Sequence, residues 1–471
     1  MSVRVALGAL CLVVSLSCVG EEELAVGGDV LEQLRLNGLG AEPGVATPFR
    51  IEDCLELENC FGNNASSAYL LFSVPPAPEQ GELEEGVVIG SLPGVTGDMS
   101  PRFLLRQDEA IVLVGRLPPE VRYFSFAPYL FDRVVGGERV TVFASLGDAL
   151  NVSTINTAGG EVFGESSVVI LSAHAPTESR VREGLVAQGV DPRSINSLVL
   201  DSSRLRLGLN VDADDTFLVL GRVSLFADAS EGEAYLEEMP WSVYRVTPKA
   251  ERAVEPLPVP ARRSRGTGTD ESGYEEALEA LDLAIRESYA DASISDVGIA
   301  SATVVQTFLD PDSCIAQNRD CRGDVSDTTY AAGPLGVTMG TDELLFPSEP
   351  EALFVAYGVN HEASGKATYA NVVLNNQARF AGVVAFDSRS MVGSAHRYLP
   401  EHPQRDALFA VHFRRDCSLD AHPCVEVPRA FPGVSDEESL FFVFRAYLES
   451  ATGVGPAAAE VLAERVLMVR P

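Results

Sequence analysis

Lysine is almost absent from this chain, which has two lysines and 33 arginines among 471 residues. Acidic residues outnumber basic ones by 68 to 35, and the formal net charge at pH 7 is −33. A nucleic-acid partner requires a concentrated basic surface, whereas the basic stretch ARRSRG at 261–266 is short and isolated. We therefore expect no nucleic-acid partner.

Apolar runs long enough to cross a bilayer are also lacking. The run VALGALCLVVSL near the N-terminus is too short to span a membrane but is typical of a secretory signal. Cleavage after Ser17 would leave Cys18 first, where a bacterial lipoprotein carries its lipid. Conventional cleavage stays open, because Ser15 stands where lipoprotein signals usually have Leu. The sequence predicts a signal peptide at 1–17 and an acidic flexible tether at 18–44.

The sequence therefore predicts that the protein is exported. It is either anchored in the outer membrane through a lipid on Cys18, which would be its only membrane contact, or free in the periplasm or outside the cell.

No two cysteines have the CxxC spacing of zinc and redox sites. Six cysteines outside the signal region form three closely spaced pairs. In an oxidising compartment such pairs form disulfides, and rings this small pin loops rather than clamp distant elements. A metal site built from Cys417, His422 and Cys424 is the competing interpretation. The predicted disulfides are Cys54–Cys60, Cys314–Cys321 and Cys417–Cys424.

Two parts of the chain contain the same motifs in the same order. The aligned blocks need no gap at either end, and they match Arg222 with Arg445 and Asn63 with Asp324. Ordered agreement of this kind predicts a two-copy duplication, with a period far longer than that of solenoid repeats. The aligned blocks are 60–69 with 321–330, 108–115 with 342–358, and 214–248 with 437–471.

The duplication defines the predicted domains. A stretch rich in Pro, Gly and charge follows Pro248 and is typical of an extended linker. Copy one then covers 45–250, the linker 251–272 and copy two 273–471. Each copy is long enough to form its own core.

Predicted strands outnumber predicted helices in both copies. In copy one we expect helices at 177–190, with Thr177 as its cap and Gly189 as its stop, and at 230–239. In copy two the Cys417–Cys424 loop takes the place of the first of these helices. Without regular βαβ alternation, the sequence predicts an α+β fold of two related domains, each a mainly antiparallel β-sheet with a few helices. The predicted strands include AIVLVG, RYFSFAPYLF, VTVFASL, SVVILSA and TFLVLGRVSLF.

The segment GVNHEASGKATY at 358–369 superficially resembles two known motifs. Six residues separate Gly358 from Gly365 where a P-loop has four, and Ala367 replaces the Ser or Thr that holds magnesium. Glycine at 365 also excludes HExxH. Its counterpart in copy one is GRLPPEVRY, so we predict a hairpin loop that is longer in copy two. Its additions give the binding candidates Asn360, His361, Lys366 and Tyr369.

No complete catalytic motif is present, and a GxSxG elbow is missing. The stretch VVAFDSRSMVGSAH at 383–396 nevertheless contains an acid, a serine and a histidine, from which a Ser-His-Asp site could be assembled. If the protein is a hydrolase, its catalytic candidates are Asp387, Ser388, His396 and His361.

Metal ligands are not arranged in a known loop. NVDADD at 210–215 alternates carboxylates but lacks the glycine and the terminal glutamate of an EF-hand. We assign no metal site and expect no cofactor, with Ca²⁺ as the one alternative.

Two functions remain. The first is an exported two-domain surface protein, a lipoprotein by its signal, that binds an unidentified ligand or partner protein in the cleft between its domains. The alternative is a secreted, esterase-like hydrolase with its site in the C-terminal domain.

Overall fold

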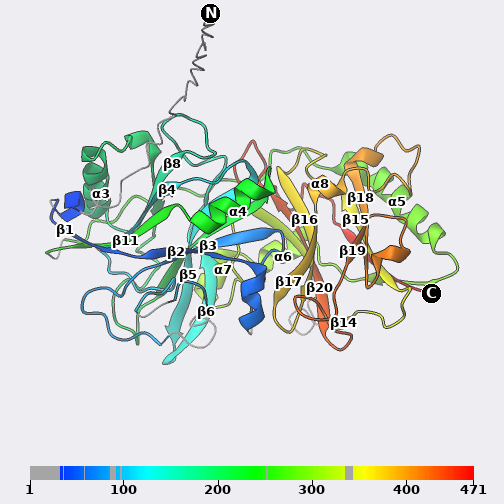
Figure 1. Cartoon of the computed structure of the whole chain (residues 1–471), viewed down its shortest axis with the longest axis horizontal. Coiled ribbons are helices and arrows are strands. Elements are labelled where there is room, and N and C mark those ends of the chain that lie inside the picture. The colour runs from blue at the N-terminus through cyan, green and yellow to red at the C-terminus, as the bar shows by residue number, and fades with distance from the viewer. Residues whose placement is uncertain are drawn as a thin grey trace, which may run out of the picture.

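The structure is a computed structural model of the chain, drawn in Figure 1. The predicted signal peptide, Cys18 and most of the tether lie outside the described residues. Among the helices of the described part, none is long and apolar enough to cross a membrane. The described residues are 32–35, 37–57, 59–84, 92–95, 98–250, 253–334 and 343–471.

The fold is α+β with more strand than helix, as predicted, and its strands form four sheets. Two sheets belong to the N-terminal half. In spatial order the outer N-sheet consists of β1 (Leu39–Pro43), β11 (Trp241–Pro248), β4 (Ala110–Arg116), β8 (Ser166–Ser172) and β9 (Ile195–Val199). The inner N-sheet consists of β2 (Val45–Phe49), β3 (Ser67–Ser73), β10 (Thr216–Phe226), β5 (Val121–Val135) and β6 (Glu138–Ser145), with β7 (Leu150–Asn151) beside β5.

The C-terminal half contains the other two sheets. The outer C-sheet consists of β12 (Ser293–Val297), β21 (Arg465–Arg470), β15 (Leu353–Val359), β18 (Leu408–Arg414) and β19 (Cys424–Glu426). The inner C-sheet consists of β13 (Thr328–Gly333), β20 (Ser439–Tyr447), β16 (Tyr369–Asn376) and β17 (Ala381–Asp387), with β14 (Leu344–Leu345) beside β20.

Helices are fewer than strands. Besides helical residues at 32–35, the described α-helices are α3 (Ala175–Ala187), α4 (Ala229–Glu238), α5 (Glu275–Ser288), α6 (Ala302–Phe308), α7 (Pro311–Gln317) and α8 (Ser388–Met391). Short 3₁₀ turns occupy Ile51–Glu56, Pro192–Ser194, Ser272–Tyr274, Arg405–Ala407 and Cys417–Leu419.

The sheets are stacked in layers along the long axis of the molecule. One core lies between the outer and inner N-sheets and another between the outer and inner C-sheets. Helix α3 covers the outer N-sheet through Val181 and Leu185, and α5 covers the outer C-sheet through Leu281 and Ile285. These two helices lie at opposite ends of the molecule, so the inner sheets lie at its centre (Figure 1). Because both faces of the inner sheets are covered, β10 and β20 are nearly continuous apolar runs.

The strand order is the same in the two halves. The outer sheets correspond strand by strand, and in each the last pair, β8–β9 or β18–β19, is parallel while the other pairs are antiparallel. The inner order β3-β10-β5-β6 corresponds to β13-β20-β16-β17. Even an unusual backbone angle recurs at aligned positions, since Leu225 has φ 58 and Leu448 has φ 46.

Three predicted disulfides are confirmed as Cys54–Cys60, Cys314–Cys321 and Cys417–Cys424. The third lies in the connection between the parallel strands β18 and β19. In the N-terminal half α3 makes the equivalent connection from β8 to β9. A disulfide loop thus replaces a helix as the crossover.

The predicted start of the helix at 177–190 is wrong. Helix α3 begins at Ala175 with His174 as its N-cap residue, because Pro176 suits the first turn of a helix. Thr177 is not the cap, and its hydroxyl donates to the Asp108 carbonyl instead, at 2.8 Å. The predicted stop is confirmed, since the helix ends at Ala187 and Gly189 has φ 88.

The segment 358–369 is not a hairpin loop. It joins β15 of the outer C-sheet to β16 of the inner C-sheet, so it crosses between layers. The equivalent segment between β4 and β5 crosses in the same way. Sequence periodicity marks strands but does not say which sheet each one joins, and the hairpin prediction failed for that reason.

The predicted linker is extended but bound along its length. Residues 253–271, which we call the strap, form no helix and no sheet strand. In the N-terminal half the Leu257 amide donates to the Ala173 carbonyl at 2.9 Å. In the C-terminal half Arg265 Nη1 donates to the Thr328 carbonyl at 3.0 Å. The strap therefore runs from one half to the other.

Candidate functional site: a central cavity between the inner sheets

An apolar cavity of about 130 Å³ lies between the two inner sheets, and both halves line it. Leucine, valine and phenylalanine side chains make up about half of its lining residues. The N-terminal half contributes Phe49, Leu71, Phe131, Phe143, Leu218 and Leu220, and the C-terminal half contributes Val305, Phe308, Leu309, Phe380, Phe441 and Val443.

Two cysteine loops border the cavity, and each crosses into the opposite half. The Cys60 loop (residues 60–64) donates from the Gly62 amide to the Phe380 carbonyl at 2.7 Å. The Cys321 loop (residues 321–325) donates from the Gly323 amide to the Phe143 carbonyl at 2.9 Å. The contacts are reciprocal. Each half therefore supplies one part of the other half's cavity wall.

Glycine is required at the tip of both loops. Gly62 and Gly323 have φ 70 and φ 68, in the left-handed region that glycine adopts readily. A Cβ atom on Gly62 would lie 2.5 Å from the ring of Phe380, and one on Gly323 would lie 2.7 Å from the ring of Phe143. The loops thus approach the phenylalanine rings as closely as a backbone can.

Arg222 on β10 and Arg445 on β20 lie at aligned positions and also make reciprocal contacts. Arg222 Nη2 donates to the Gly323 carbonyl at 3.0 Å, and Arg445 Nη2 donates to the Gly62 carbonyl at 3.2 Å. Their exposed fractions are 6% and 5%, and both line the cavity. In each guanidinium group the buried Nη1 has no hydrogen-bond partner.

The arginines lie against tyrosine rings rather than carboxylates. Arg222 lies 5.4 Å from the ring centre of Tyr129, and Arg445 lies 5.9 Å from that of Tyr330. Burial raises the pKa of both phenols, although the neighbouring Arg222 opposes the shift. These tyrosines are therefore neutral at pH 7 and do not neutralise the arginines.

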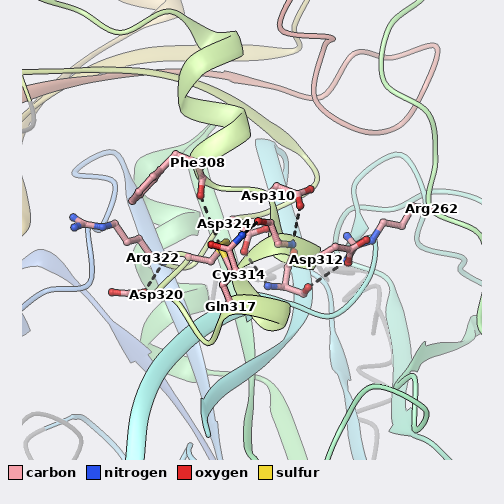
Figure 2. The surroundings of a disulfide bond; sticks show 12 residues. Arg262, Phe308, Asp310, Asp312, Cys314, Gln317, Asp320, Arg322 and Asp324 are labelled. Atoms are coloured by element: carbon pink, nitrogen blue, oxygen red, sulfur yellow. Dashed lines mark hydrogen bonds and ion pairs between the residues drawn. A yellow bond between two sulfur atoms is a disulfide. The ribbon is translucent and has the colours of Figure 1, made fainter. Parts of the chain in front are cut away.

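Two buried aspartates of the C-terminal half lie close to this group. Asp324 accepts from the Ser145 amide at 2.9 Å, and Asp327 accepts from Asn151 Nδ2 at 2.9 Å. Burial raises the pKa of each carboxyl group to about 6, although these hydrogen bonds oppose the shift. Figure 2 shows Asp324 and Arg322 beside the Cys314–Cys321 disulfide.

The sequence-predicted candidate His361 lies elsewhere, in a buried ion-pair cluster. Its Nδ1 is 2.8 Å from Glu271 and its Nε2 is 2.9 Å from Glu464. Burial by itself would lower the pKa of the imidazole, but the two carboxylates raise it to about 10. The ring is therefore protonated at neutral pH and donates from both nitrogens, which leaves neither free to accept a proton.

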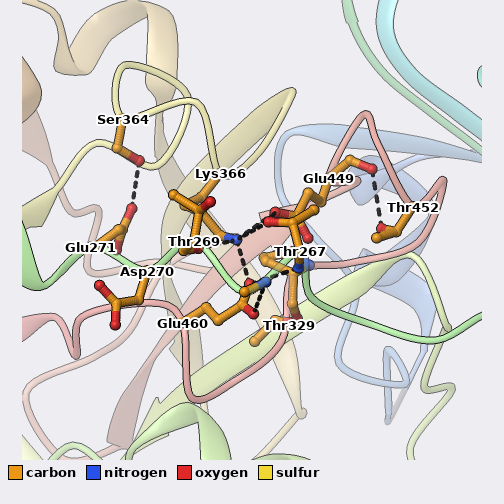
Figure 3. Close-up of polar contacts among 12 residues, drawn as sticks. Thr267, Thr269, Asp270, Glu271, Thr329, Ser364, Lys366, Glu449, Thr452 and Glu460 are labelled. Carbon is orange, nitrogen blue, oxygen red and sulfur yellow. Dashed lines mark hydrogen bonds and ion pairs between the residues drawn. The ribbon is translucent and has the colours of Figure 1, made fainter.

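Lys366 is held in the same manner. Its Nζ contacts Glu449 and lies 2.6 Å from Glu460, and it donates to the Thr269 carbonyl of the strap at 2.8 Å. Figure 3 shows this ammonium group surrounded by the strap and the two glutamates. With an exposed fraction of 4% it is enclosed by protein.

The other two binding candidates also make internal contacts. Asn360 Nδ2 donates to the Ser388 carbonyl at 3.1 Å. The Tyr369 ring stacks on Tyr447 with ring centres 4.9 Å apart, and its hydroxyl accepts from Asn371 Nδ2 at 2.8 Å. Both side chains are buried.

The catalytic candidates are not assembled into a triad. Asp387 caps α8, accepting from the Arg389 amide at 2.9 Å, and the Ser388 hydroxyl donates to Glu362. His396 pairs with Asp406 near the surface. Within the described ranges, no hydrogen bond joins Ser388 to His361 or to His396.

Metal binding finds no support in the described part of the chain. No group of three or more His, Cys, Asp and Glu side chains there is arranged to hold an ion. The metal site built from Cys417, His422 and Cys424 is wrong, because the two thiols form a disulfide and the His422 ring stacks on Tyr398.

Sequence reasoning matched Arg222 with Arg445 but did not propose either as a site residue. A signal was present, since each arginine interrupts a strand that is otherwise nearly all apolar, TFLVLGRVSLF or SLFFVFRAY. A charged residue in such a run is buried, and a buried charge needs a partner.

Comparison with known proteins does not identify the chain. No protein-family model matches it, and no curated protein matches it. An uncharacterised protein from Burkholderia cenocepacia has a solved structure that is 13% identical with a TM-score of 0.38, over 94% of this chain and 87% of that one. A protein from Vibrio parahaemolyticus is 11% identical with a TM-score of 0.36, over 78% and 88%. At these scores neither structure carries an argument about function.

Proposed function

We propose that this is an exported two-domain binding protein that takes an apolar small molecule into the central cavity. The carrying observation is the cavity itself, which is lined by apolar side chains of both inner sheets with a few polar groups among them. Ligand sites are typically concave, mostly apolar and formed where domains meet.

The two domains of the proposal are copy one at 45–250 and copy two at 273–471, related by duplication. The shared strand order and the parallel pair at the same sheet edge support this relationship. So does the reciprocal exchange of the Cys60 and Cys321 loops. A duplicated pair that meets face to face creates a shared cavity that neither copy has alone.

Export is supported by the three disulfides, which are typical of proteins outside the reducing cytosol. The signal peptide and a lipid anchor on Cys18 belong to the proposal on the strength of the sequence. The esterase-like alternative gains no contact from the described residues, so we do not propose it.

The test uses N-phenyl-1-naphthylamine, a neutral apolar fluorophore that brightens when it leaves water. We expect saturable binding to the purified protein. Val443→Phe places a larger side chain in the cavity wall and is expected to weaken binding about tenfold or more. Val392→Phe is the matched control, because Val392 is 66% exposed and lies outside the cavity wall.

Circular dichroism checks that both variants fold. Absence of saturable binding to the wild-type protein would contradict the proposal. An affinity that Val443→Phe leaves unchanged would contradict it equally, because the fluorophore would then bind elsewhere.

A further inference from the structure

The central cavity contains buried positive charge that the protein does not neutralise by contact. Within the described ranges, no carboxylate forms an ion pair with Arg222 or Arg445. Every other strongly buried cation discussed above touches at least one carboxylate, as His361 and Lys366 do. Arg222 and Arg445 thus differ from His361 and Lys366, whose charges are paired within the protein.

An unpaired buried charge is costly, and two like charges in one cavity add repulsion. Asp324 and Asp327 offset part of the Arg222 charge from a distance, but neither carboxylate forms a hydrogen bond or an ion pair with either cavity arginine. Asp324 accepts from Ser145 through both oxygens, and Asp327 accepts from Asn151 and Tyr123. Such an arrangement is expected where a ligand supplies the missing negative charge.

The geometry around each guanidinium group is suited to an anion. The bond from Nη2 to the opposite cysteine loop fixes the group, and the tyrosine faces flank it. Nη1 is left without a partner in both residues. Two preorganised N–H donors of this type, one from each half, match the oxygens of a carboxylate or phosphate.

We propose that the ligand is an amphiphile whose oxoanion head binds beside the guanidinium groups of Arg222 and Arg445 while its apolar body lies along the phenylalanine and leucine wall. A fatty-acid-like carboxylate and an alkyl phosphate share this chemistry. The inference rests on the proposed function and adds the chemical class of the ligand.

Arg322 and Arg102 also line the cavity but have other roles. Arg322 lies 4.5 Å from the ring centre of Phe380, and Arg102 pairs with Asp132 at 2.9 Å. Arg322 adds positive potential to the cavity, whereas Asp132 balances the charge of Arg102. Asp324 is the one acidic residue among the described residues that line the cavity, against four arginines, so the wall favours an anion despite the net charge of −33.

The experiment compares three ligands that share the same alkyl chain and differ in their head group. Decanoate, decyl phosphate and decan-1-ol each displace N-phenyl-1-naphthylamine from the wild-type protein at pH 7.5. Charge-assisted hydrogen bonds predict that at least one anion binds about ten- to a hundredfold more tightly than the alcohol. The two anionic arms decide between a carboxylate and a phosphate head.

Three variants then locate the head. Arg222→Gln and Arg445→Gln each keep a donor but lose the charge, and each is expected to reduce the preference for the anion about tenfold or more. Arg193→Gln changes the net charge identically at an exposed surface pair with Asp191 and is expected to leave the preference unchanged. Binding of the neutral fluorophore to each variant shows that the cavity is intact.

The outcomes separate the two proposals. If decan-1-ol binds as tightly as both anions, the oxoanion site is refuted while the binding function stands. If neither the fluorophore nor any of the three ligands binds the wild-type protein, the binding function itself fails. If either cavity variant disrupts the fold, the wild-type comparison of anion with alcohol still decides.

Discussion

At the scale of single residues, four buried cations fall into two groups. Two form structural ion pairs, and two line the candidate binding site. His361 and Lys366 each contact two glutamates, so their charges are compensated within the protein. Arg222 and Arg445 have carbonyl and tyrosine neighbours and an Nη1 without a partner. Removing one partner of a buried ion pair destabilises a fold, whereas the two arginines without an ion pair are the basis of the proposed oxoanion site.

His361→Gln is expected to lower the free energy of unfolding at pH 7 by about 3–5 kcal/mol, because Glu271 and Glu464 would remain buried without their cation. Folding raises the pKa of this histidine from 6.5 to about 10. Its contribution is therefore complete below pH 6.5 and is lost as the pH rises through 10. Denaturant unfolding at pH 7 and pH 10 should show the difference between variant and wild type shrinking.

The control for this prediction is His396→Gln, which alters a 41% exposed side chain at the surface and should change stability little at either pH. An equal loss for His361→Gln at both pH values would mean that the imidazolium charge is not what stabilises the cluster.

The strap is the element whose behaviour the sequence least anticipated. Its composition is typical of a flexible linker, yet residues 253–271 are hydrogen-bonded to both halves. Lys366 fastens the strap through Thr269, and Glu271 fastens it through His361. The longer segment 358–369 of the C-terminal half therefore anchors the connection between halves.

Lys366→Met is expected to release the strap. The substitution leaves Glu449 and Glu460 without their cation. If local opening of the strap then costs about 1.4 kcal/mol less, trypsin cleavage after the strap arginines is expected to be about tenfold faster. Cleavage between 262 and 265 is followed by mass spectrometry of the fragments.

Lys249→Met is the matched control, because Lys249 is the other lysine of the chain, is exposed, and donates to the Arg35 carbonyl outside the strap. If both variants were cleaved at the wild-type rate, the anchoring role of Lys366 would be excluded.

At the scale of the whole molecule, the cavity is a joint product of two interlocked halves. Phe143 and Phe380 each receive a glycine loop from the opposite half. Disturbing one such contact should therefore affect both stability and ligand binding. The apolar wall, the Cys60 and Cys321 loops and the two arginines all border the same cavity.

Gly323→Ala is expected to destabilise the protein and weaken binding of N-phenyl-1-naphthylamine. The left-handed backbone costs about 1–2 kcal/mol, and overpacking against Phe143 adds about 1–3 kcal/mol. Gly365→Ala carries only the backbone cost, because Gly365 has φ 83 and nothing within 4 Å of its Cβ position. Equal losses in the two variants, measured by denaturant unfolding, would argue against a tight contact between the halves.

Much of the fold could be predicted from local patterns. The strand TFLVLGRVSLF matches β10, and the helix predicted at 230–239 differs from α4 by one residue at each end. Short cysteine spacings were sufficient for the three disulfides. These features depend on neighbours in sequence, which is why they could be predicted.

The candidate site could not be predicted in the same way. His361 and Lys366 stood out in the sequence, but glutamates enclose both side chains. These glutamates are distant in sequence, with Glu271 and Glu464 beside His361 and Glu460 beside Lys366. The cavity arginines were marked in the sequence as a matched pair within apolar strands, but nothing there indicated that they line one cavity.

The sequence by itself determined the α+β composition, the positions of the strands, the disulfide pairs and the matching order of motifs, because each depends on local spacing and side-chain type. Only the tertiary structure decided that β15 and β16 belong to different sheets, that the linker is a bound strap, and that Arg222 and Arg445 line one cavity. Those features depend on which distant segments pack together, and packing between layers leaves no periodic trace along the chain.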